Sequence, residues 1–447
     1  MPSRESHSRR NDLAAFWLPF TANRAFRKAP RMLARAKGMY YYDEAERALL
    51  DTCSGLWCVN AGHGRKPIAE AIAGAAATLD YAPTFQFGHP SAFELATRLV
   101  ALAPAGLDHV FFVNSGSEGV DAALKIARGY FHAKGDSGRF RLIGRAKAYH
   151  GATLAGISVG GIANNRNAFG PLLPGTDDHL PLPYDASTMA FTRGEPEGGR
   201  EFADALEQAI ALHGAKTIAA VIVEPMAGSA GVFAPPKDYL PRLRTLCDAH
   251  GILLIFDEVI TAFGRLGHAF AADRYGVVPD MIVFAKGVTN GAVPMGGVLV
   301  SAPIYDAFMQ GSPQAIELFH GHTYSGHPLA CAAALATLDL CRDDDLFARA
   351  RRLEPIFAEA VHGLREAPFV ADIRNVGLAA GIDLEPDLSG PGRRGYEVLA
   401  RGFAEENLVL RVSGDTVALA PALVVLEAEI ARMTEGLRAV LRRLGRG

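Results

Sequence analysis

Five short apolar segments recur through the middle of the chain, at residues 109–113, 219–223, 252–256, 281–285 and 297–300. Their shortness and their Val, Ile and Phe content favour buried strands over helices. Segments with helical spacing lie between and after them, such as Val120, Ala123, Leu124, Ala127 and Phe131, or the run 328–341. Strands alternating with helices predict an α/β fold in which helices cover both faces of a mostly parallel sheet.

The two ends of the chain show a different pattern. Residues 39–52 have the pattern of a strand, a turn and a strand, and from about residue 339 helices alternate with short strands. We therefore expect a smaller α+β domain built from both termini. In this division residues 1–75 and 339–447 form the small domain, and residues 76–338 form the large one.

Composition narrows the class of partner. The 447 residues are 49% hydrophobic and carry a formal net charge of −3, without a block of like charge suited to nucleic acid or an anionic membrane. A small-molecule partner is expected. The five cysteines are widely spread and contain no CxxC, so neither a disulfide framework nor a metal site is indicated.

The start of the chain and its apolar runs bear on location. The apolar stretch at residues 13–20 is short and broken by Pro19, so no signal peptide is predicted. No run reaches the roughly 18–20 uncharged residues that a membrane span needs. We expect a soluble protein of the reducing cytoplasm.

Polar residues follow four of the predicted strands. They are Asn114 and Ser115, Glu224, Asp257 and Glu258, and Lys286. In α/β sheets ligands bind outside the carboxyl ends of the strands, so these residues are candidates for one site. Any one of them could simply end a strand, but four such positions together favour a shared site.

The segment NSGSEG at residues 114–119 follows a strand and begins a helix. Ser115 and Glu118 have the spacing of a capping box. Free N–H groups, a glycine and two serine hydroxyls at a helix N-terminus suit an anion such as a phosphate. Many helices begin in this way without a ligand, so this segment alone leaves both interpretations open.

Lys286 ends an apolar strand and precedes a glycine-rich turn. Desolvation there would lower its pKa and favour the neutral amine that forms Schiff bases, although a lysine at a strand end can also simply extend to solvent. Asp257 ends another buried strand one βαβ step earlier. A buried carboxylate needs a partner, and a protonated pyridine nitrogen would serve.

Longer segments carry a family resemblance. VEPMAGSAGV (223–232), FDEVITAFGRLG (256–267), FAKGVTNGAVPMGG (284–297) and HTYSGHPLACAAALATL (322–338) closely resemble the class III, fold-type I aminotransferases. Within that class, residues 16–26, 37–43, 54–66 and 157–166 resemble the ω-amino acid:pyruvate, or β-alanine:pyruvate, branch. The resemblance runs over nearly the whole chain and implies pyridoxal 5′-phosphate as cofactor.

The resemblance implies a role for each residue of the site. Lys286 would hold the cofactor as a Schiff base and move the proton, and Asp257 would pair with the pyridine nitrogen. The other cofactor-binding residues would be Ser115, Gly116 and Ser117 at the phosphate, Tyr149 and Val259 on the two ring faces, and His150 and Glu224. Thr323 of a neighbouring subunit would also reach the phosphate, which implies a homodimer or a dimer of dimers with shared sites.

Substrate contacts are implied in the same way. Leu56, Trp57, Phe85 and Phe87 would form apolar walls beside Tyr149, and Arg411 would bind the substrate carboxylate, because its planar fork suits that group. Relatives that act on ornithine or γ-aminobutyrate have a glutamate at the position of Ser229, where this chain has a small neutral residue. This departure favours an arginine that is free to bind pyruvate.

The expected reaction is a ping-pong transfer of an amino group from an ω-amino acid or a simple amine to pyruvate, giving alanine. Other class III chemistries remain open, with taurine, polyamine or γ-aminobutyrate donors, or an aminomutase. A noncatalytic regulator that binds pyridoxal phosphate is an alternative from a different class. The presence of both Lys286 and Asp257, and the lack of an attached basic DNA-binding helix, count against it.

Overall fold

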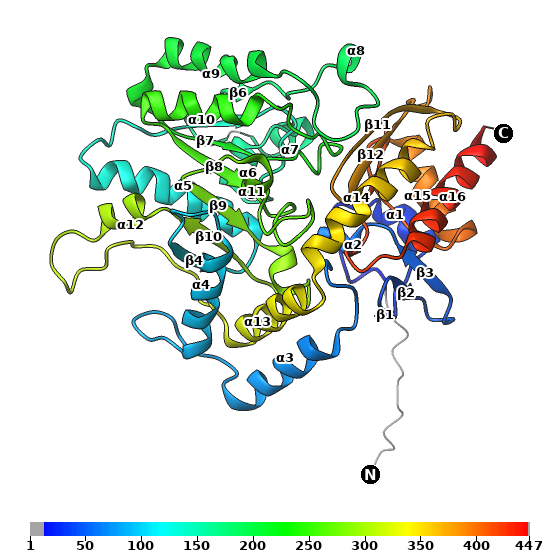
Figure 1. The fold of residues 1–447 in the computed structure, drawn as a ribbon, viewed down its shortest axis with the longest axis horizontal. Helices are drawn as coiled ribbons and strands as arrows, with labels where there is room; N and C mark the ends of the chain where they lie inside the picture. The colour runs from blue at the N-terminus through cyan, green and yellow to red at the C-terminus, as the bar shows by residue number, and fades with distance from the viewer. Residues whose placement is uncertain (1–12, 171, 446–447) are drawn as a thin grey trace.

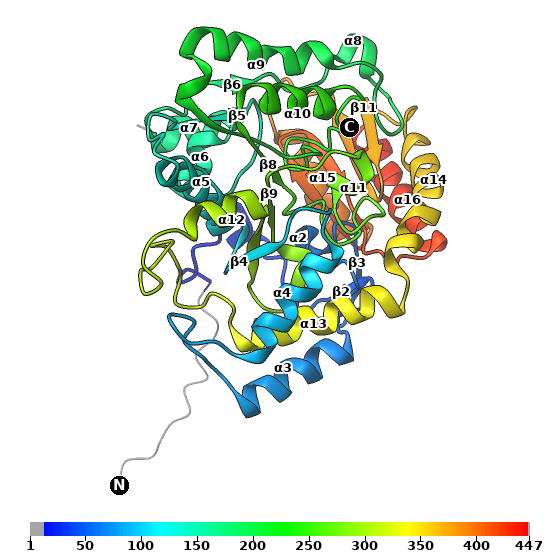
Figure 2. The same ribbon diagram turned by 60° about the vertical axis from the view of Figure 1, so that its left-hand side comes forward.

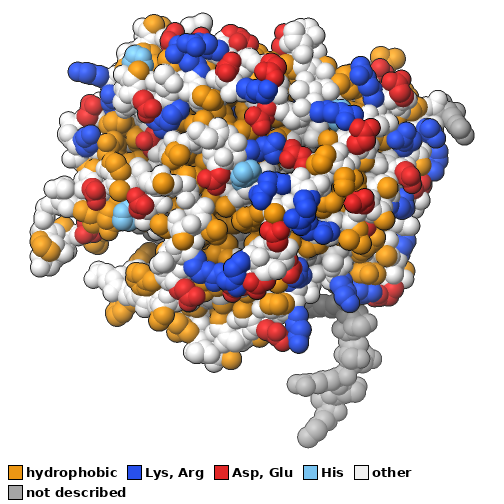
Figure 3. Space-filling view, in the orientation of Figure 1, with side chains coloured by type: hydrophobic (Ala, Val, Ile, Leu, Met, Phe, Trp, Pro, Cys, Tyr) orange, Lys and Arg blue, Asp and Glu red, His pale blue; other side chains and the backbone are white. Residues whose placement is uncertain are grey.

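The computed structural model describes residues 13–170 and 172–445 and shows two lobes, the larger on the left in Figure 1 and the smaller on the right. The basic start of the chain, at which no signal peptide is predicted, lies mostly in residues 1–12, outside the described part. Within the described ranges, no helix combines the length and the apolar character that crossing a membrane requires. Lysines, arginines and acidic residues are interspersed over the face in Figure 3.

The larger lobe contains a seven-stranded sheet in the order β4-β10-β9-β8-β7-β5-β6. Its strands are β4 (His109–Val113), β5 (Arg141–Arg145), β6 (His179–Leu180), β7 (Ile218–Val223), β8 (Leu253–Asp257), β9 (Met281–Phe284) and β10 (Gly296–Val300). Strand β10 is antiparallel to both of its neighbours, while the pairs from β9 to β6 are parallel. The prediction of a mostly parallel sheet is therefore confirmed, with β10 as the exception.

Helices cover both faces of this sheet because successive residues of its buried strands point to opposite sides. On one face Ile222, Ile255 and Val283 pack with α5 (Gly116–Ala133), the helix predicted from its apolar spacing. On the other face Val221 and Leu254 belong to a second apolar cluster. This cluster also contains residues of α4 (Pro90–Leu102), α9 (Arg200–His213), α10 (Tyr239–His250) and α13 (Pro328–Asp343).

The smaller lobe joins the two ends of the chain. Strands β1 (Arg35–Lys37), β2 (Tyr40–Tyr42), β3 (Ala48–Asp51) and β13 (Leu408–Val409) form one four-stranded sheet. Strands β11 (Val370–Val376), β12 (Ala379–Leu384), β15 (Thr416–Leu419) and β14 (Arg411–Ser413) form another. Met39 and Leu50 share a buried core with α14 (Leu346–His362), α15 (Arg393–Glu405) and α16 (Glu427–Leu444). The predicted strand, turn and strand at 39–52 correspond to β2 and β3.

Two helices run across the expected domain boundaries. Helix α13 continues through residues 338 and 339, and α3 (Lys66–Thr78) continues past residue 75 and lies along α13 (Figures 1 and 2). The division at these residues stays a prediction. The shorter helices are α1 (Asn23–Lys28), α2 (Ser54–Trp57), α6 (Leu154–Val159), α7 (Ala163–Phe169), α8 (Ala186–Met189), α11 (Ala271–Tyr275), α12 (Ala302–Phe308), η1 (Ala215–Thr217) and η2 (Lys286–Thr289).

Candidate active site

The strand ends that the sequence singles out meet at one edge of the large sheet. Strands β7, β8 and β9 are neighbours and run in parallel. Strand β4 runs in the same direction, because β4 and β9 are both antiparallel to β10. The residues after these four strands therefore share the edge at which ligands bind in such sheets.

Lys286 follows β9 and begins the 3-10 helix η2. Its backbone φ is +48°, a left-handed conformation that strains a residue with a side chain and is concentrated at functional sites. Burial lowers the pKa of its amine, and two nearby acidic groups, the Cys58 thiol and the Asp257 carboxylate, oppose that shift. Within residues 13–170 and 172–445, no hydrogen bond or ion pair engages its Nζ atom. Desolvation makes the neutral, nucleophilic form of this amine easier to reach than in an exposed lysine.

Asp257, at the end of β8, is paired with a buried histidine. Its Oδ2 lies 2.8 Å from His150 Nδ1, and its Oδ1 accepts a hydrogen bond of 3.1 Å from Val259 N. The His150 side chain is fully buried, and its Nε2 has no hydrogen-bond partner in the described part of the chain. The pair places a carboxylate on the Lys286 side of the sheet edge, near enough for its charge to act on the amine.

Glu224 connects two loops that border this edge. Its carboxylate accepts hydrogen bonds from Tyr149 N at 3.1 Å and from Gly228 N at 3.0 Å, and Arg145 Nη2 lies 3.7 Å from it. Burial raises the pKa of Glu224, and the positive charge of Arg145 opposes that shift. Both carboxylate oxygens are thus engaged by the protein itself. The observed contacts are those of a residue that positions the Tyr149 loop.

Glu258 points away from the candidate site. It accepts hydrogen bonds from Ala271 N, Ala272 N and Thr261 Oγ1, and burial raises its pKa to about 7. Asp257 and Glu258 are consecutive, so their side chains leave the end of the strand on opposite sides. Of the polar residues after the strands, Glu258 therefore serves the start of α11.

The N-terminus of α5 forms a cradle of backbone donors. Ser115 Oγ accepts from Glu118 N at 3.2 Å, and the Glu118 carboxylate accepts from Asn114 N at 2.7 Å, so the capping interaction reaches one residue further back than predicted. In the part of the chain that the structure describes, the N–H groups of Gly116 and Ser117 have no acceptor. A Cβ atom on Gly116 would lie 2.8 Å from Val259 Cγ2, so glycine is needed for this close approach.

These groups fit the cofactor that the resemblance implies. An unpaired amine suits its aldehyde, a buried carboxylate suits its ring nitrogen, and free N–H groups at a helix N-terminus suit its phosphate. Tyr149 is partly buried beside them. Lys286, Asp257, Gly116 and Tyr149 come from segments far apart in the chain and meet at one edge of the sheet.

Arg411 lies close to this group. It is the first residue of β14, and its Nη1 donates to its neighbour's carbonyl, Val412 O, at 3.0 Å. Burial raises the pKa of Tyr149, and the charge of Arg411 acts against that shift. Arg411 and Lys286 also both act on the buried thiol of Cys53, whose pKa burial raises to about 12. Arg411 therefore lies within electrostatic range, on the order of 10 Å, of both Tyr149 and Cys53.

The other predicted substrate contacts divide into two groups. Leu56 and Trp57 lie on the α2 turn beside this edge, Leu56 half-exposed and Trp57 buried with Cys53. Phe85 and Phe87 are exposed and lie beside the loop that contains Thr323. Among the described residues, no hydrogen bond, ion pair or ring contact joins Phe85, Phe87 or Thr323 to Lys286 or Asp257.

Phe85, Phe87 and the Thr323 loop form a separate surface. They surround a hollow of about 310 Å³ together with His320. Tyr81 donates a hydrogen bond of 3.0 Å to Thr323 O, which holds the loop against the segment that contains the two phenylalanines. Thr323 itself is exposed. Among the residues that the structure describes, those that line this hollow include neither Lys286 nor Asp257.

Some residues at the site were not predicted individually. The Phe20 ring packs edge-on against Tyr149, with ring centroids 6.5 Å apart. Cys58 lies close enough to Lys286 for each of the two groups to affect the pKa of the other. Both lie in segments that carried the resemblance as a whole, at residues 16–26 and 54–66. The sequence offered only weak signals for them: Phe20 is an aromatic residue within a segment of the resemblance, and Cys58 directly follows the predicted Trp57.

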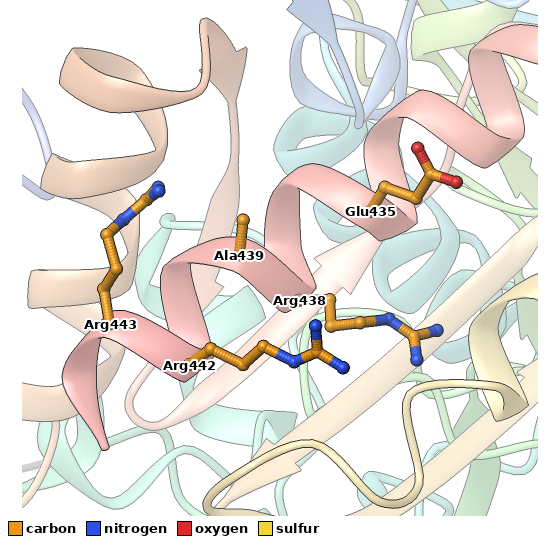
Figure 4. Close-up of a pocket in the computed structure, with 5 residues that line it drawn as sticks. All are labelled: Glu435, Arg438, Ala439, Arg442 and Arg443. Atoms are coloured by element: carbon orange, nitrogen blue, oxygen red, sulfur yellow. The ribbon is translucent and has the colours of Figure 1, made fainter. Parts of the chain in front are cut away.

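A larger surface hollow lies elsewhere, on helix α16. It measures about 500 Å³ and is lined by Glu435, Arg438, Ala439, Arg442 and Arg443. Arg438 and Arg442 extend on one side of the helix and Arg443 on the other (Figure 4). It shares no residue with the Lys286 group, so we assign it no part in catalysis.

Comparison with known proteins gives one consistent result. A family model described as aminotransferase class-III matches residues 21–441. The chain is 57% identical to an omega-aminotransferase of Caulobacter vibrioides, over 96% of this chain and 98% of that protein. It is 49% identical to a beta-alanine–pyruvate aminotransferase of Pseudomonas aeruginosa, over 96% of each.

A solved structure agrees with these relatives. The amine transaminase of an uncultivated Pseudomonas species, in its PLP-bound form, superposes with a TM-score of 0.87 at 37% identity. The match covers 96% of this chain and 98% of that one. The fold and the order of the segments are thus shared over nearly the whole length.

Proposed function

The chain belongs to the class III aminotransferases, and from this we propose that it transfers an amino group from an ω-amino acid or a simple amine to pyruvate, with pyridoxal 5′-phosphate as cofactor. The observation that carries the proposal is the unpaired, partly buried amine of Lys286 beside the Asp257–His150 pair. The activities in the names of the two relatives support the choice of donor class and acceptor.

Four elements would hold the cofactor. Lys286 would bind it covalently, Asp257 would pair with its ring nitrogen, and the N-terminus of α5 at Gly116 would bind its phosphate. Tyr149 and Val259 would cover the two faces of the ring. When bound, the cofactor supplies an electron-withdrawing ring that stabilises negative charge on the carbon bearing the amino group.

The side chains of this protein would perform the proton transfer and the binding. The Nζ of Lys286, which desolvation favours in its neutral form, accepts a proton from the donor carbon and later returns it. Asp257 would present its carboxylate to the ring nitrogen, held in place by His150 and by Val259 N. Glu224 positions the Tyr149 loop through its backbone hydrogen bond.

Arg411 would bind the carboxylate of pyruvate. No acidic side chain in the described part of the chain pairs with its guanidinium, so its charge is available to a substrate. The same pocket must first accept the donor and then pyruvate. We expect Arg411 to contact the carboxylate-bearing substrate and to move aside for an uncharged amine substituent.

A second subunit would complete each site. Thr323, Phe85 and Phe87 share an exposed surface that is not joined to the Lys286 group of their own chain. Exposed apolar surface of this kind is typical of an interface. We therefore propose a homodimer, or a dimer of dimers, in which this surface contributes to the neighbouring site.

All five cysteines are free thiols, which supports the expectation of a reducing cytoplasm.

A donor screen with pyruvate as acceptor tests the proposal. Alanine is measured after incubation with β-alanine, 1-phenylethylamine, putrescine, taurine and γ-aminobutyrate. Alanine from β-alanine or 1-phenylethylamine supports the proposal. Alanine only from taurine, putrescine or γ-aminobutyrate would assign a different donor class. A protein that binds pyridoxal phosphate but forms no alanine from any donor would be a regulator instead.

A further inference from the structure

The α2 turn at the edge of the candidate site has an unusual backbone. Ser54 and Trp57 have φ values of +49° and +63°, and Gly55 between them has +66°. Left-handed conformations of residues with side chains cost free energy and persist only where the surroundings hold them in place. The turn contains Leu56 and Trp57 and leads directly to Cys58, which lies near Lys286. What holds this turn therefore also shapes the site.

One end of the turn is held by Asp51. Its Oδ1 accepts a hydrogen bond of 3.0 Å from Cys53 N, and its Oδ2 accepts one of 2.5 Å from Gly55 N. His63 Nε2 lies 2.8 Å from the same Oδ2, and the Tyr41 ring packs against His63 with centroids 4.4 Å apart. Asp51 is 2% exposed. A single buried carboxylate thus holds two backbone donors of the turn.

The other end is held by Arg265, whose side chain is fully buried. Its Nη2 donates to Ser54 Oγ and to Asn60 Oδ1, both at 2.8 Å. Its Nη1 donates to Leu378 O at 3.1 Å and to Pro421 O at 2.5 Å, in the smaller lobe. All four acceptors are neutral. A buried cation without a bonded carboxylate is costly, so its position between the turn and the smaller lobe calls for an explanation.

The turn is also fastened to the segment that begins with Lys286. Ala61 N donates to Asn290 Oδ1 at 2.8 Å, and Asn290 Nδ2 donates to Gly62 O at 2.9 Å. Asn60 packs so closely on Gly287 that a Cβ atom there would lie 2.8 Å from Asn60 Nδ2. A displacement of the turn would therefore be transmitted to the loop after Lys286.

We propose that Asp51 and Arg265 are positioning residues that hold the Ser54–Trp57 turn in its strained conformation and so set which amine donors fit beside Lys286. The inference rests on the proposed function for its substrate. Neither residue has to touch the donor, because both act through Leu56 and Trp57. The turn itself is the specificity element.

Kinetics on the holoenzyme test this proposal. The variants are Asp51→Asn, Arg265→Met and the conservative Arg265→Lys, each measured with β-alanine, 1-phenylethylamine and pyruvate. Displacements of about 1 Å can change rates on the order of 10²-fold. We expect the ratio of kcat/KM between the two donors to change at least about tenfold, while the absorbance of the bound cofactor is unchanged. Lys cannot reproduce the guanidinium fork, so Arg265→Lys should lie between the parent and Arg265→Met.

Matched controls exist for both residues. Asp43 also holds a turn of the smaller lobe, accepting from Ala45 N and Arg47 N. Arg139 also donates to backbone carbonyls, those of Ile218 and Gly251. Asp43→Asn and Arg139→Lys should leave the donor ratio at the parent value. Equal losses with both donors in the test variants, or the same change of ratio in the controls, would overturn the proposal.

Alkylation of Cys58 gives a readout that does not depend on activity. The other four cysteines are buried, and Cys58 is partly exposed on the segment that the turn leads into. We expect iodoacetamide to modify Cys58 faster in the test variants while the other four stay protected. Modification at the parent rate, or of all five together, would contradict a local role for the two residues. If the parent makes no alanine from any donor, the proposed function fails. The labelling of Cys58 still tests whether Asp51 and Arg265 hold the Ser54–Trp57 turn.

Discussion

Replacing Asp257 by asparagine removes a negative charge with little change in shape. The amide oxygen can still accept the hydrogen bond from Val259 N, which is 3.1 Å long in the parent, and the amide nitrogen then faces His150. The strand end should therefore keep its conformation, and the cofactor should still bind. What is lost is the charge that holds a proton on the ring nitrogen.

The expected loss follows from the burial of the pair. Asp257 is 6% exposed and His150 1%. In the holoenzyme the charge partner of Asp257 would be the protonated ring nitrogen, and removing one partner of a buried charge pair costs about 3–5 kcal/mol. The ring nitrogen needs this stabilisation most when negative charge develops on the substrate carbon, so we expect the loss to appear in the barrier. Each 1.36 kcal/mol added to a barrier is a factor of ten in rate, so the half-reaction with the donor should slow between roughly a hundredfold and a few thousandfold.

Stopped-flow absorbance of the bound cofactor, after mixing with a saturating donor, measures this half-reaction directly. Asp280→Asn is a matched control, because Asp280 is also paired, with Arg244 and Leu254 N, but precedes β9 at the opposite end of the strand from Lys286. It should lose stability and keep the parent rate. A rate for Asp257→Asn within a fewfold of the parent would mean that the charge of Asp257 does not contribute to the reaction and that the residue is structural.

Thr323, Arg411 and Lys286 can each be tested by substitution. Mixing Lys286→Ala chains with Thr323→Ala chains should give more activity than either variant alone. If Thr323 serves the neighbouring subunit's site, a heterodimer has one site with both substitutions and one site with neither. No recovery despite proven subunit exchange would place Thr323 in its own subunit's site. Arg411→Ala should weaken the half-reactions with pyruvate and alanine by roughly 30-fold to a few thousandfold, whereas the step with a carboxylate-free amine survives in single-turnover traces; equal losses would mean that Arg411 supports the fold. Without cofactor, Lys286→Met should unfold at higher urea than the parent at neutral pH, because burial lowers the pKa of Lys286 and so disfavours the charged amine in the folded state relative to the unfolded one. The difference should shrink as the pH rises toward 10.5, where the unfolded chain also loses this proton, and a difference that stays constant with pH would contradict the prediction.

Much of the large sheet could be predicted because its strands are buried on both faces. Strands β4 and β7 to β10 correspond to the uninterrupted apolar runs. Strand β5 begins and ends with arginine and β6 has two residues, so neither forms such a run. The antiparallel direction of β10 follows from a connection that contains only the short helix η2, since a parallel return needs a longer crossover.

The site was predictable as far as strand ends determine it. Lys286 and Asp257 follow neighbouring strands, and neighbouring parallel strands end at the same edge. The pairing of Asp257 with His150 spans 107 residues and depends on how a loop folds back, which no local pattern shows. Glu258 follows Asp257 directly and is equally polar. It lies outside the site because consecutive side chains at a strand end point to opposite sides. The hold of Arg265 on Ser54 likewise depends on how the lobes pack.

The proposed function depends above all on Lys286 as the residue that holds the cofactor. Borohydride reduction of the purified protein, followed by peptide mass spectrometry, identifies that residue. We expect a yellow protein whose cofactor becomes fixed on the peptide that contains Lys286, and a colourless Lys286→Ala variant with no fixed cofactor. Fixation on another lysine, or covalently reducible cofactor in Lys286→Ala, would show that Lys286 does not have this role.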